Sequence, residues 1–317
     1  MKSLNLKNKK ILLTGGGGFL GSFVYQELLM AGAQKKNITI PRSKTHDLRD
    51  INVCKKLAKN KDIIIHLAAN VGGIGYNQLH PGSLFYDNLI MGAQVMEAAR
   101  RAHIEKFVAI GTICAYPKHT PVPFSEKNLW NGYPEETNAP YGLAKKMLLV
   151  QSQAYRSEYG LRSIYLLPVN LYGPRDNFNP RSSHVIPALI KKIYEAKKNN
   201  LPEVVVWGTG RATREFLYVK DAAKAIVLAT LHYDKPEPIN LGSGSEISIK
   251  KLAQLIAKTL DYRGKIIWDT TKPDGQPRRK LNISSAKKEF GFSSQTTFQK
   301  GLEETIKWYT ENYDQLS

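Results

Sequence analysis

The stretch ILLTGGGGFLGSF, residues 11–23, decides the fold class. It begins with a short apolar run typical of a buried strand, continues into glycines at positions 15, 18 and 21, and then enters a segment with helical periodicity. Glycines allow a tight turn and the close approach of a backbone to a ligand, and the free amides at a helix N-terminus attract a pyrophosphate. A flexible loop without a ligand is the alternative, but the strand–loop–helix context favours a dinucleotide.

Segments typical of strands and helices alternate through the first half of the chain. The expected strands are 10–14, 37–41, 62–66, 107–110 and 163–167. The expected helices are 19–30, 51–58, 84–102 and 141–159. Strands separated by helical crossovers form a parallel sheet with both faces covered. The sequence therefore predicts an α/β protein with a Rossmann-type doubly wound parallel sheet.

The end of the second expected strand indicates which dinucleotide would bind. An acidic residue there would hold the ribose hydroxyls of NAD, but ITIPRSKTHDL supplies Arg42 and Lys44, two cations that suit a 2′-phosphate. NADP(H) is therefore favoured, with ordinary surface charge as the alternative, and Asp47 is placed to reach the adenine. The loop residues expected to bind the cofactor are Gly15, Gly16, Gly17, Gly18, Phe19, Leu20 and Gly21.

After Pro168 the alternation loosens into a segment rich in Gly, Pro and Asn, and then resumes with helices at 185–197, 221–231 and 249–260 and a strand at 204–208. Ligands of such sheets bind at the carboxyl ends of the strands. We expect an NADP-binding Rossmann domain over 1–167, with returning segments near 214–241. Residues 168–213 and 242–317 are expected to form a smaller, mostly C-terminal α/β substrate-binding domain over that edge.

Composition limits the partners and the compartment. The 317 residues carry a formal net charge of +19 and are 42% hydrophobic. Because the lysines are scattered and no basic tail is present, nucleic acid is disfavoured as the main ligand. The apolar runs are too short for a membrane span or a signal peptide, so we expect a cytoplasmic protein. Two cysteines suit a reducing compartment, and no metal site is expected.

A second motif, PYGLAKK, supplies a candidate proton donor. Tyr141 and Lys145 are four residues apart at an expected helix start, so their side chains share one face. A nearby cation stabilises phenolate and lowers the pKa of a tyrosine towards the range of a working acid. Such a spacing is common on surface helices, but Thr112 at the end of the fourth expected strand and the glycine loop make it more informative.

Together with HLAAN at 66–70, these residues resemble the extended short-chain dehydrogenase/reductases. Within them, five segments resemble the GDP-L-fucose synthases: NVGGIGYN at 70–77, GTICAYP at 111–117, NLYGPRDNFNPRSSHVIPALI at 170–190, VVVWGTGRATREFLYVKDAA at 204–223 and KPDGQPRRKLN at 272–282. The resemblance implies an NADPH-dependent homodimeric enzyme that epimerises GDP-4-keto-6-deoxy-D-mannose at carbons 3 and 5 and then reduces carbon 4.

The resemblance also implies a role for Cys114 as the base and for His184 as the acid of the epimerisation. Protons on carbons 3 and 5 are acidified by the neighbouring keto group, so an enolate can form where a donor holds its oxygen. A thiol of pKa about 8.5 and an imidazole of pKa about 6.5 straddle neutral pH, which suits removal on one face and delivery on the other. The alternative is a small buried thiol with an unrelated histidine.

Further contacts follow from the same resemblance. Arg214 is expected to hold the nucleotide diphosphate, which a planar guanidinium suits, and Asn88 to support the site. The other expected substrate contacts are Lys192, Trp207 and Asp274, although Trp207 could equally pack in the core. The other expected cofactor contacts are Pro168, Asn170, Leu171, Lys145 and His184.

The chain lacks the sequence patterns of two related classes of enzyme, the dehydratases and the simple 4-epimerases. Dehydratases of this superfamily carry an acidic pair directly after the catalytic Thr or Ser, whereas this chain has Ile113 and Cys114. Simple 4-epimerases usually have an acidic end to the second strand, which is absent here. Gly16 and Gly17 stand where some synthases carry a basic residue against the NADP phosphate, which leaves that task to Arg42 and Lys44.

Two other functions stay open at this point. The first is a reductase or epimerase-reductase for a related GDP-4-keto-6-deoxy sugar such as a heptose, since one extra carbon changes few contacts. The second is a non-catalytic Rossmann-like protein that binds RNA through its positive charge.

Overall fold

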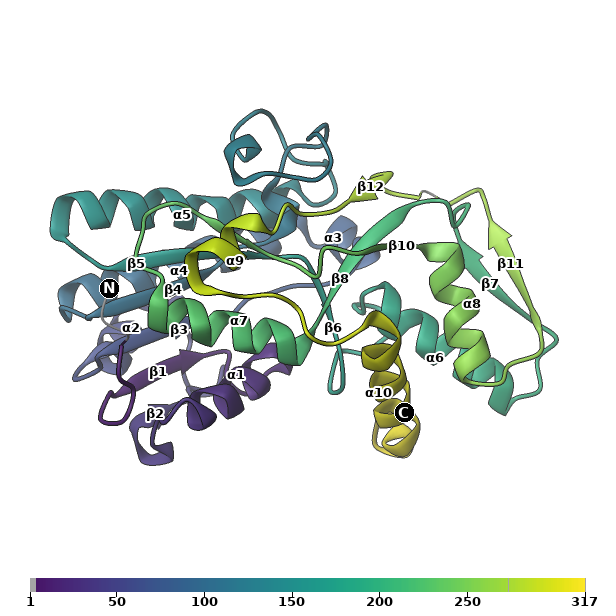
Figure 1. Cartoon of the computed structure of the whole chain (residues 1–317), viewed down its shortest axis with the longest axis horizontal. Helices are drawn as coiled ribbons and strands as arrows, with labels where there is room; N and C mark the ends of the chain where they lie inside the picture. The colour runs from purple at the N-terminus through teal and green to yellow at the C-terminus, as the bar shows by residue number, and fades with distance from the viewer. Residues whose placement is uncertain (1–3, 273, 317) are drawn as a thin grey trace.

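The computed structural model describes residues 4–272 and 274–316, which form a larger lobe beside a smaller one (Figure 1). Within these residues, six strands of the larger lobe form a parallel sheet in the order β2-β1-β3-β4-β5-β9. The strands are β1 (Ile11–Thr14), β2 (Ile38–Thr39), β3 (Ile63–His66), β4 (Lys106–Ile110), β5 (Ser163–Pro168) and β9 (Ile239–Leu241). The sheet confirms the expected Rossmann-type doubly wound α/β fold.

Helices cover both faces of this sheet. Helices α1 and α7 pack together on one face, and α2, α4 and α5 pack on the other (Figure 1). The long helices are α1 (Phe19–Met30), α2 (Ile51–Ala58), α4 (Pro81–Arg101), α5 (Ala139–Tyr159) and α7 (Val219–His232). The short ones are η1 (Lys35–Asn37), α3 (Ile74–Leu79), η2 (Ile113–Ala115), η3 (Glu126–Asn128) and α9 (Ser284–Phe290).

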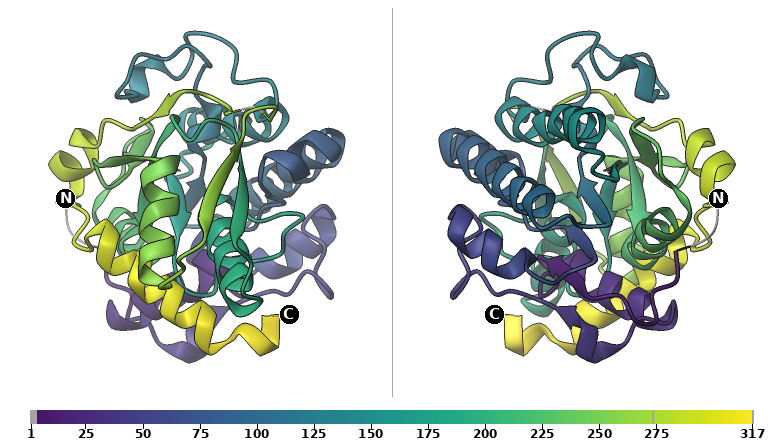
Figure 2. Two further views of the ribbon diagram at one scale, coloured as in Figure 1. Left: turned by 90° about the vertical axis from the view of Figure 1, so that its right-hand side faces the viewer. Right: turned by 90° about the vertical axis from the view of Figure 1, so that its left-hand side faces the viewer.

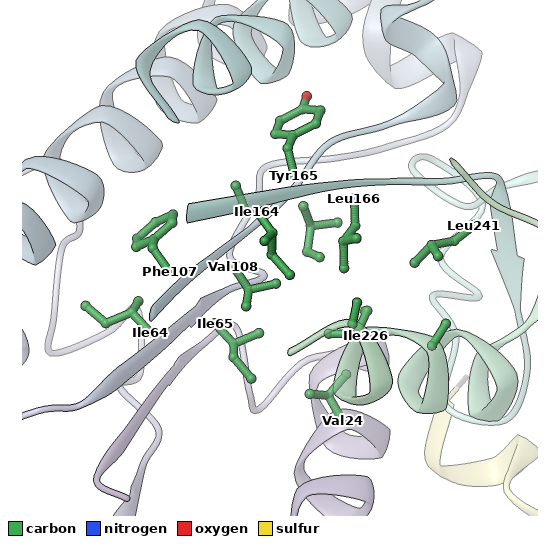
Figure 3. Packing of buried hydrophobic residues seen from close by; sticks show 14 of the residues in the cluster. Val24, Ile64, Ile65, Phe107, Val108, Ile164, Tyr165, Leu166, Ile226 and Leu241 are labelled. Atoms are coloured by element: carbon green, nitrogen blue, oxygen red, sulfur yellow. The ribbon is translucent and has the colours of Figure 1, made fainter. Parts of the chain in front are cut away.

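The sheet forms where the chain is apolar on both faces. Residues 63–65, 107–109 and 164–167 are all fully buried, as expected for strands covered on two sides. Figure 3 shows the alternation: Tyr165 of β5 points to the face of α5, while Leu166 points towards Ile226 of α7. The Tyr165 hydroxyl donates to the Lys145 carbonyl at 2.8 Å, which fixes α5 over the carboxyl half of the sheet.

The smaller lobe has its own buried apolar cluster, formed mainly by α6, α8 and α10 against β7 and β8. Its strands are β6 (Asn170–Tyr172), β7 (Glu203–Trp207), β8 (Thr213–Tyr218), β10 (Glu246–Ser248), β11 (Lys265–Asp269) and β12 (Arg278–Arg279). Its helices are α6 (Val185–Lys198), α8 (Ile249–Thr259), α10 (Phe298–Glu311) and α11 (Tyr313–Leu316). The left view of Figure 2 shows α8 and α10 in front of the larger lobe.

Strand β8 joins the two lobes. It pairs in parallel with β6 and β12 and antiparallel with β10, and its last residue leads directly into α7 of the larger lobe. One segment differs from the expected division of the chain. Residues 281–292, expected in the substrate-binding part, pack into the larger cluster because α9 lies against β9 and α7.

No helix in the described part of the chain is long and apolar enough to cross a membrane. Cys54 and Cys114 are both free thiols. Residues 116–138 form an excursion from the sheet that lies above the start of α5 in Figure 1 and at the top of both views in Figure 2.

Candidate active site

A cavity of about 1650 Å³ lies between the lobes, at the carboxyl ends of β1, β3, β4 and β5. All of the catalytic, cofactor-binding and substrate-binding residues expected from the sequence line it except Gly16 and Lys44, and the expected supporting residue Asn88 lies behind the lining. Gly16 is buried on the inner side of its loop, where a Cβ atom would lie 2.9 Å from the Ile40 side chain. Lys44 is exposed and lies outside the lining.

The glycine loop turns directly after β1. Gly15 has φ of +70°, and a Cβ atom there would lie 2.7 Å from the Ala68 amide nitrogen. A Cβ atom at Gly21 would lie 2.1 Å from the Gly15 carbonyl oxygen, so this position in α1 also has to be glycine. Gly17 and Gly18 are exposed on the cavity side, directly before α1 begins. The loop therefore presents backbone at a helix N-terminus, as a pyrophosphate requires.

Arg42 lies across this loop. A Cβ atom on Gly17 would be only 1.8 Å from Arg42 Nη1, so the guanidinium occupies the space that a larger residue at position 17 would need. Asp47 is held in place by Arg49, whose Nη2 and Nε donate to it at 2.8 and 3.0 Å. Arg49 also donates to Asp87 at 2.9 Å. Of the two cations expected to contact a 2′-phosphate, Arg42 is therefore the one that lies on the glycine loop.

The Tyr141 and Lys145 pair stands on the first turns of α5, with Pro140 at the helix start. Burial raises the pKa of the Tyr141 phenol, negative charge at Cys114 raises it further, and a hydrogen bond with Thr112 opposes both effects. The expected lowering of this pKa by Lys145 is therefore wrong for the protein without ligands, because burial dominates, and the phenol keeps its proton at neutral pH. A Cβ atom on Gly142 would lie 2.3 Å from the Cys114 carbonyl oxygen, so this glycine allows α5 to contact the cysteine backbone.

Lys145 is 1% exposed and lines the cavity. Burial lowers the pKa of its ammonium to about 8. Among the residues that the structure describes, no protein group accepts a hydrogen bond from its Nζ, and the residue borders the open cavity. A ligand hydroxyl in the cavity would supply the missing acceptor.

Cys114 lies in η2, directly after β4. Its backbone amide donates to Thr112 Oγ1 at 3.2 Å, which places the threonine and the cysteine side by side. Its sulfur lies 3.7 Å from Asn138 Oδ1 and 3.6 Å from Arg279 Nη1. Asn138 and Arg279 were not expected from the sequence. Arg279 belongs to the KPDGQPRRKLN segment, which also contains the expected substrate contact Asp274. Membership of that segment was the signal that could have identified Arg279.

His184 is the residue before α6 and faces the cavity. Surrounding protein atoms lower the pKa of its imidazole, although the side chain remains open to the cavity. Gly73 fixes the segment before it: its amide donates to Ser182 O at 3.0 Å, and a Cβ atom there would lie 2.4 Å from Ser183 O. The loop of Gly73 therefore holds the histidine segment over the sheet edge.

Asn88 in α4 supports that same loop. Its Oδ1 accepts from the Asn70 amide at 3.1 Å, and its Nδ2 donates to the Asn70 carbonyl at 2.8 Å. The side chain is 2% exposed, so these bonds form in the interior. Asn88 thus holds the backbone of the loop at Asn70 from within the protein.

The smaller lobe contributes the other side of the cavity. Arg214 on β8 donates to the carbonyls of Thr213 at 2.8 Å and Asp274 at 3.3 Å, and burial, with Arg279 adding, lowers its pKa to about 10. Asp274 accepts from the Thr209 amide and hydroxyl at 2.7 and 2.6 Å, and the hydroxyl bond lowers the carboxyl pKa.

The two remaining residues of this side lie on neighbouring elements. Trp207 at the end of β7 is exposed, so it is available for stacking and is not part of a core. Lys192 Nζ donates to the Val205 carbonyl at 2.8 Å at the cavity wall.

The residues of the larger lobe fit a pyridine dinucleotide phosphate. The exposed glycine backbone offers amides for a pyrophosphate. The Arg42 guanidinium offers a cation for a 2′-phosphate, and the Lys145 ammonium offers a donor for ribose hydroxyls. Among the described residues, no group of three or more His, Cys, Asp or Glu side chains is arranged to hold a metal ion.

Comparisons with known proteins agree with this geometry. Residues 11–242 match the model of the NAD dependent epimerase/dehydratase family. The chain is 40% identical to the probable GDP-L-fucose synthase 1 of Oryza sativa subsp. japonica, over 96% of this chain and 93% of that protein. It is also 40% identical to the GDP-L-fucose synthase of Sinorhizobium fredii, over 97% of each chain.

Among solved structures, the GDP-L-fucose synthetase of Naegleria fowleri bound to NADP superposes with a TM-score of 0.89 at 30% identity and covers 99% of this chain and 98% of its own. The family model spans most of the chain, and the curated relatives match it along nearly all of its length. The chain therefore belongs to the NAD dependent epimerase/dehydratase family and, within it, to the GDP-L-fucose synthases.

Proposed function

We propose that this protein converts GDP-4-keto-6-deoxy-D-mannose to GDP-L-fucose with NADPH, by epimerisation at carbons 3 and 5 followed by reduction at carbon 4. The observation that carries the proposal is that one cavity is lined both by Tyr141, Lys145 and Thr112 and by the second acid–base pair, Cys114 and His184. A simple reductase needs only the first set. A second pair on the same cavity supports a second proton-transfer reaction.

In the epimerisation, Cys114 takes a proton from the carbon beside the keto group, and His184 delivers one to the opposite face. The two side chains come from different lobes, Cys114 from η2 of the larger one and His184 from the start of α6 in the smaller one, and both line the cavity. The developing oxyanion at carbon 4 needs a donor, and the protonated Tyr141 phenol supplies it. Thr112 orients that phenol.

In the reduction, NADPH held by the glycine loop, Arg42 and Lys145 would supply the hydride for carbon 4 of the sugar. Tyr141 gives its proton to the resulting alkoxide, and its raised pKa keeps that proton available at neutral pH. Lys145 binds the cofactor ribose with its free ammonium and stabilises the phenolate that remains. Arg214, held by two backbone carbonyls, binds the GDP diphosphate from the smaller lobe.

Turnover of GDP-4-keto-6-deoxy-D-mannose with NADPH in D₂O tests this function. We expect GDP-L-fucose with deuterium at carbons 3 and 5. Cys114→Ser should incorporate little deuterium, because a hydroxyl is far too weak an acid to replace a thiolate, and His184→Asn should exchange protons without efficient inversion. A deoxy sugar of the original configuration, or turnover only with a GDP-heptose, would refute the proposed substrate and reaction.

We also propose that the protein works as a cytoplasmic homodimer. The free thiol of Cys114 must stay reduced to act as a base, which supports a reducing compartment. Apolar side chains of α4 and α5 are exposed, among them Phe85, Tyr86 and Val150, and would be covered by a second copy. Sedimentation equilibrium measures the mass, and a monomer at micromolar concentration would contradict the dimer.

A further inference from the structure

The sulfur of Cys114 is contacted by a cation from a distant part of the chain. Arg279, 165 positions away in the sequence, directs Nη1 at Cys114 Sγ across 3.6 Å. Its side chain is 10% exposed, so water weakens this interaction little. Strand β12 places it: Arg279 pairs with Arg214 in the register of β12 against β8, which brings the second lobe to the cysteine.

Further contacts hold this guanidinium in one orientation. Its Nε donates to Gln276 Oε1 at 2.7 Å, and its Nη2 lies 3.9 Å from the Glu135 carboxylate. Just beyond it, the Leu281 amide donates to the buried Glu215 carboxylate at 2.6 Å, which anchors the chain after β12. The cation therefore has little freedom to leave the sulfur.

Asn138, the other neighbour of the sulfur, presents an acceptor. Its Nδ2 and its backbone amide both donate to Glu135 Oε2, and its Oδ1 accepts from Asn77 Nδ2 at 3.2 Å. This orientation directs Oδ1 at Cys114, 3.7 Å away. A carbonyl oxygen can accept from a thiol but repels a thiolate. Stabilisation of the thiolate must therefore come from elsewhere.

We propose that Arg279 is a positioning residue that stabilises the thiolate of Cys114, the form that can take a proton from the sugar. The charged and titratable groups near the sulfur are Arg279 on β12, Arg214 on β8, Tyr141 on α5 and Glu135 before α5. Arg279 is the cation with a hydrogen-bond contact to the sulfur. The inference rests on the proposed role of Cys114 as the base.

Alkylation of the free protein by iodoacetamide tests the inference without any substrate. The rate at Cys114 is followed from pH 5 to pH 10 by peptide mass spectrometry, since only the thiolate reacts. Arg279→Gln should slow alkylation at pH 7 by about tenfold or more and move its rise to higher pH, because a cation within 4–6 Å strongly favours an anion. Arg279→Lys, which keeps the charge, should recover most of the rate.

Two internal controls accompany this measurement. Arg278→Gln removes the same charge from the neighbouring residue of β12, but Arg278 is exposed and paired with Glu246, so its alkylation profile should match wild type. Cys54 reports on unfolding, because burial raises its thiol pKa to about 12 and it should stay unreactive in every folded variant.

The decisive outcome is the alkylation profile of Arg279→Gln. A profile equal to wild type overturns the inference, and a parallel loss of GDP affinity would then assign Arg279 to the diphosphate. An Arg279→Lys rate as low as that of Arg279→Gln also overturns it, since charge would not be the cause. A failure of GDP-L-fucose formation in wild type leaves this profile unchanged, so the two proposals are separately refutable.

Discussion

Lys145 is buried at the cavity wall, and none of the described residues accepts a hydrogen bond from its ammonium. Lys145→Met should therefore stabilise the protein when no cofactor is bound. Burial lowers the pKa of this ammonium from 10.5 to about 8. Since a tenfold change in proton affinity is worth about 1.4 kcal/mol, keeping the proton in the folded state costs about 3 kcal/mol. Methionine has a similar volume and carries no charge, so we expect a gain in unfolding free energy of up to that size.

The pH dependence identifies the cause. Below pH 8 the ammonium is protonated in both the folded and the unfolded state, and the destabilisation is fully present. Between pH 8 and about 10.4 the folded state loses the proton while the unfolded state still binds it, so wild type becomes more stable relative to the variant. The advantage of Lys145→Met should therefore be largest at pH 6–7 and should vanish near pH 10.5.

Urea unfolding at intervals from pH 6 to pH 10 measures this difference. Lys146→Met is a matched control, because Lys146 is also buried but donates to the Leu129 carbonyl and lies over the Trp130 ring at 4.2 Å. Removing that donor leaves a carbonyl unpaired and should destabilise the protein by about 1–3 kcal/mol. A Lys145→Met protein that is less stable than wild type at pH 7, or whose advantage does not change with pH, would refute the reasoning.

Two further substitutions test the cofactor and proton-donor assignments. Arg42→Ala should raise the Michaelis constant for NADPH by about tenfold or more, the scale of a lost charge-assisted hydrogen bond, while that for NADH changes little. Lys44→Ala, outside the cavity lining, should leave both constants near wild type, and equal effects of Arg42→Ala on the two cofactors would contradict the 2′-phosphate role. Tyr141→Phe should slow reduction by roughly 10²-fold or more in single-turnover measurements. Proton exchange at carbons 3 and 5 should persist at a reduced rate, and its complete loss would mean that the two reactions do not use separate acid–base groups.

The larger lobe was predictable because its signals are local. Each strand is a short apolar run, and the residues directly after it must lie at one edge of a parallel sheet. It could therefore be predicted, without any knowledge of tertiary contacts, that one cavity is lined by Thr112 and Cys114 after β4 and by the glycines after β1. The sequence did not indicate which of Arg42 and Lys44 would line the cavity, because the loop after β2 has no periodicity that shows which side chain faces inward.

The surroundings of Cys114 could not be predicted from local pattern. Arg279 reaches the sulfur through β12, a strand of two residues that pairs with β8 across more than sixty positions of the chain. Asn138 is fixed by Glu135, and neither residue belongs to an apolar repeat or a glycine turn. The same reason explains the placement of residues 281–292, since a short helix such as α9 can cover either lobe until its neighbours are known.

Cations line the cavity, and their charge favours the binding of anionic ligands. Lys145 and Arg279 are buried cations and Arg214 is a half-buried one, and loss of water contact lowers the pKa of Lys145 to about 8 and that of Arg214 to about 10. Near them Asp274 is held by Thr209, and Glu135 is the carboxylate closest to Arg279. A site with excess buried positive charge is unfavourable in the free protein and becomes favourable when phosphates, ribose hydroxyls and a thiolate fill it. Anionic ligands should therefore stabilise the folded protein beyond what their apolar contacts provide, and the Lys145→Met variant should lose that added stability with NADPH because its gain without cofactor comes from the same charge.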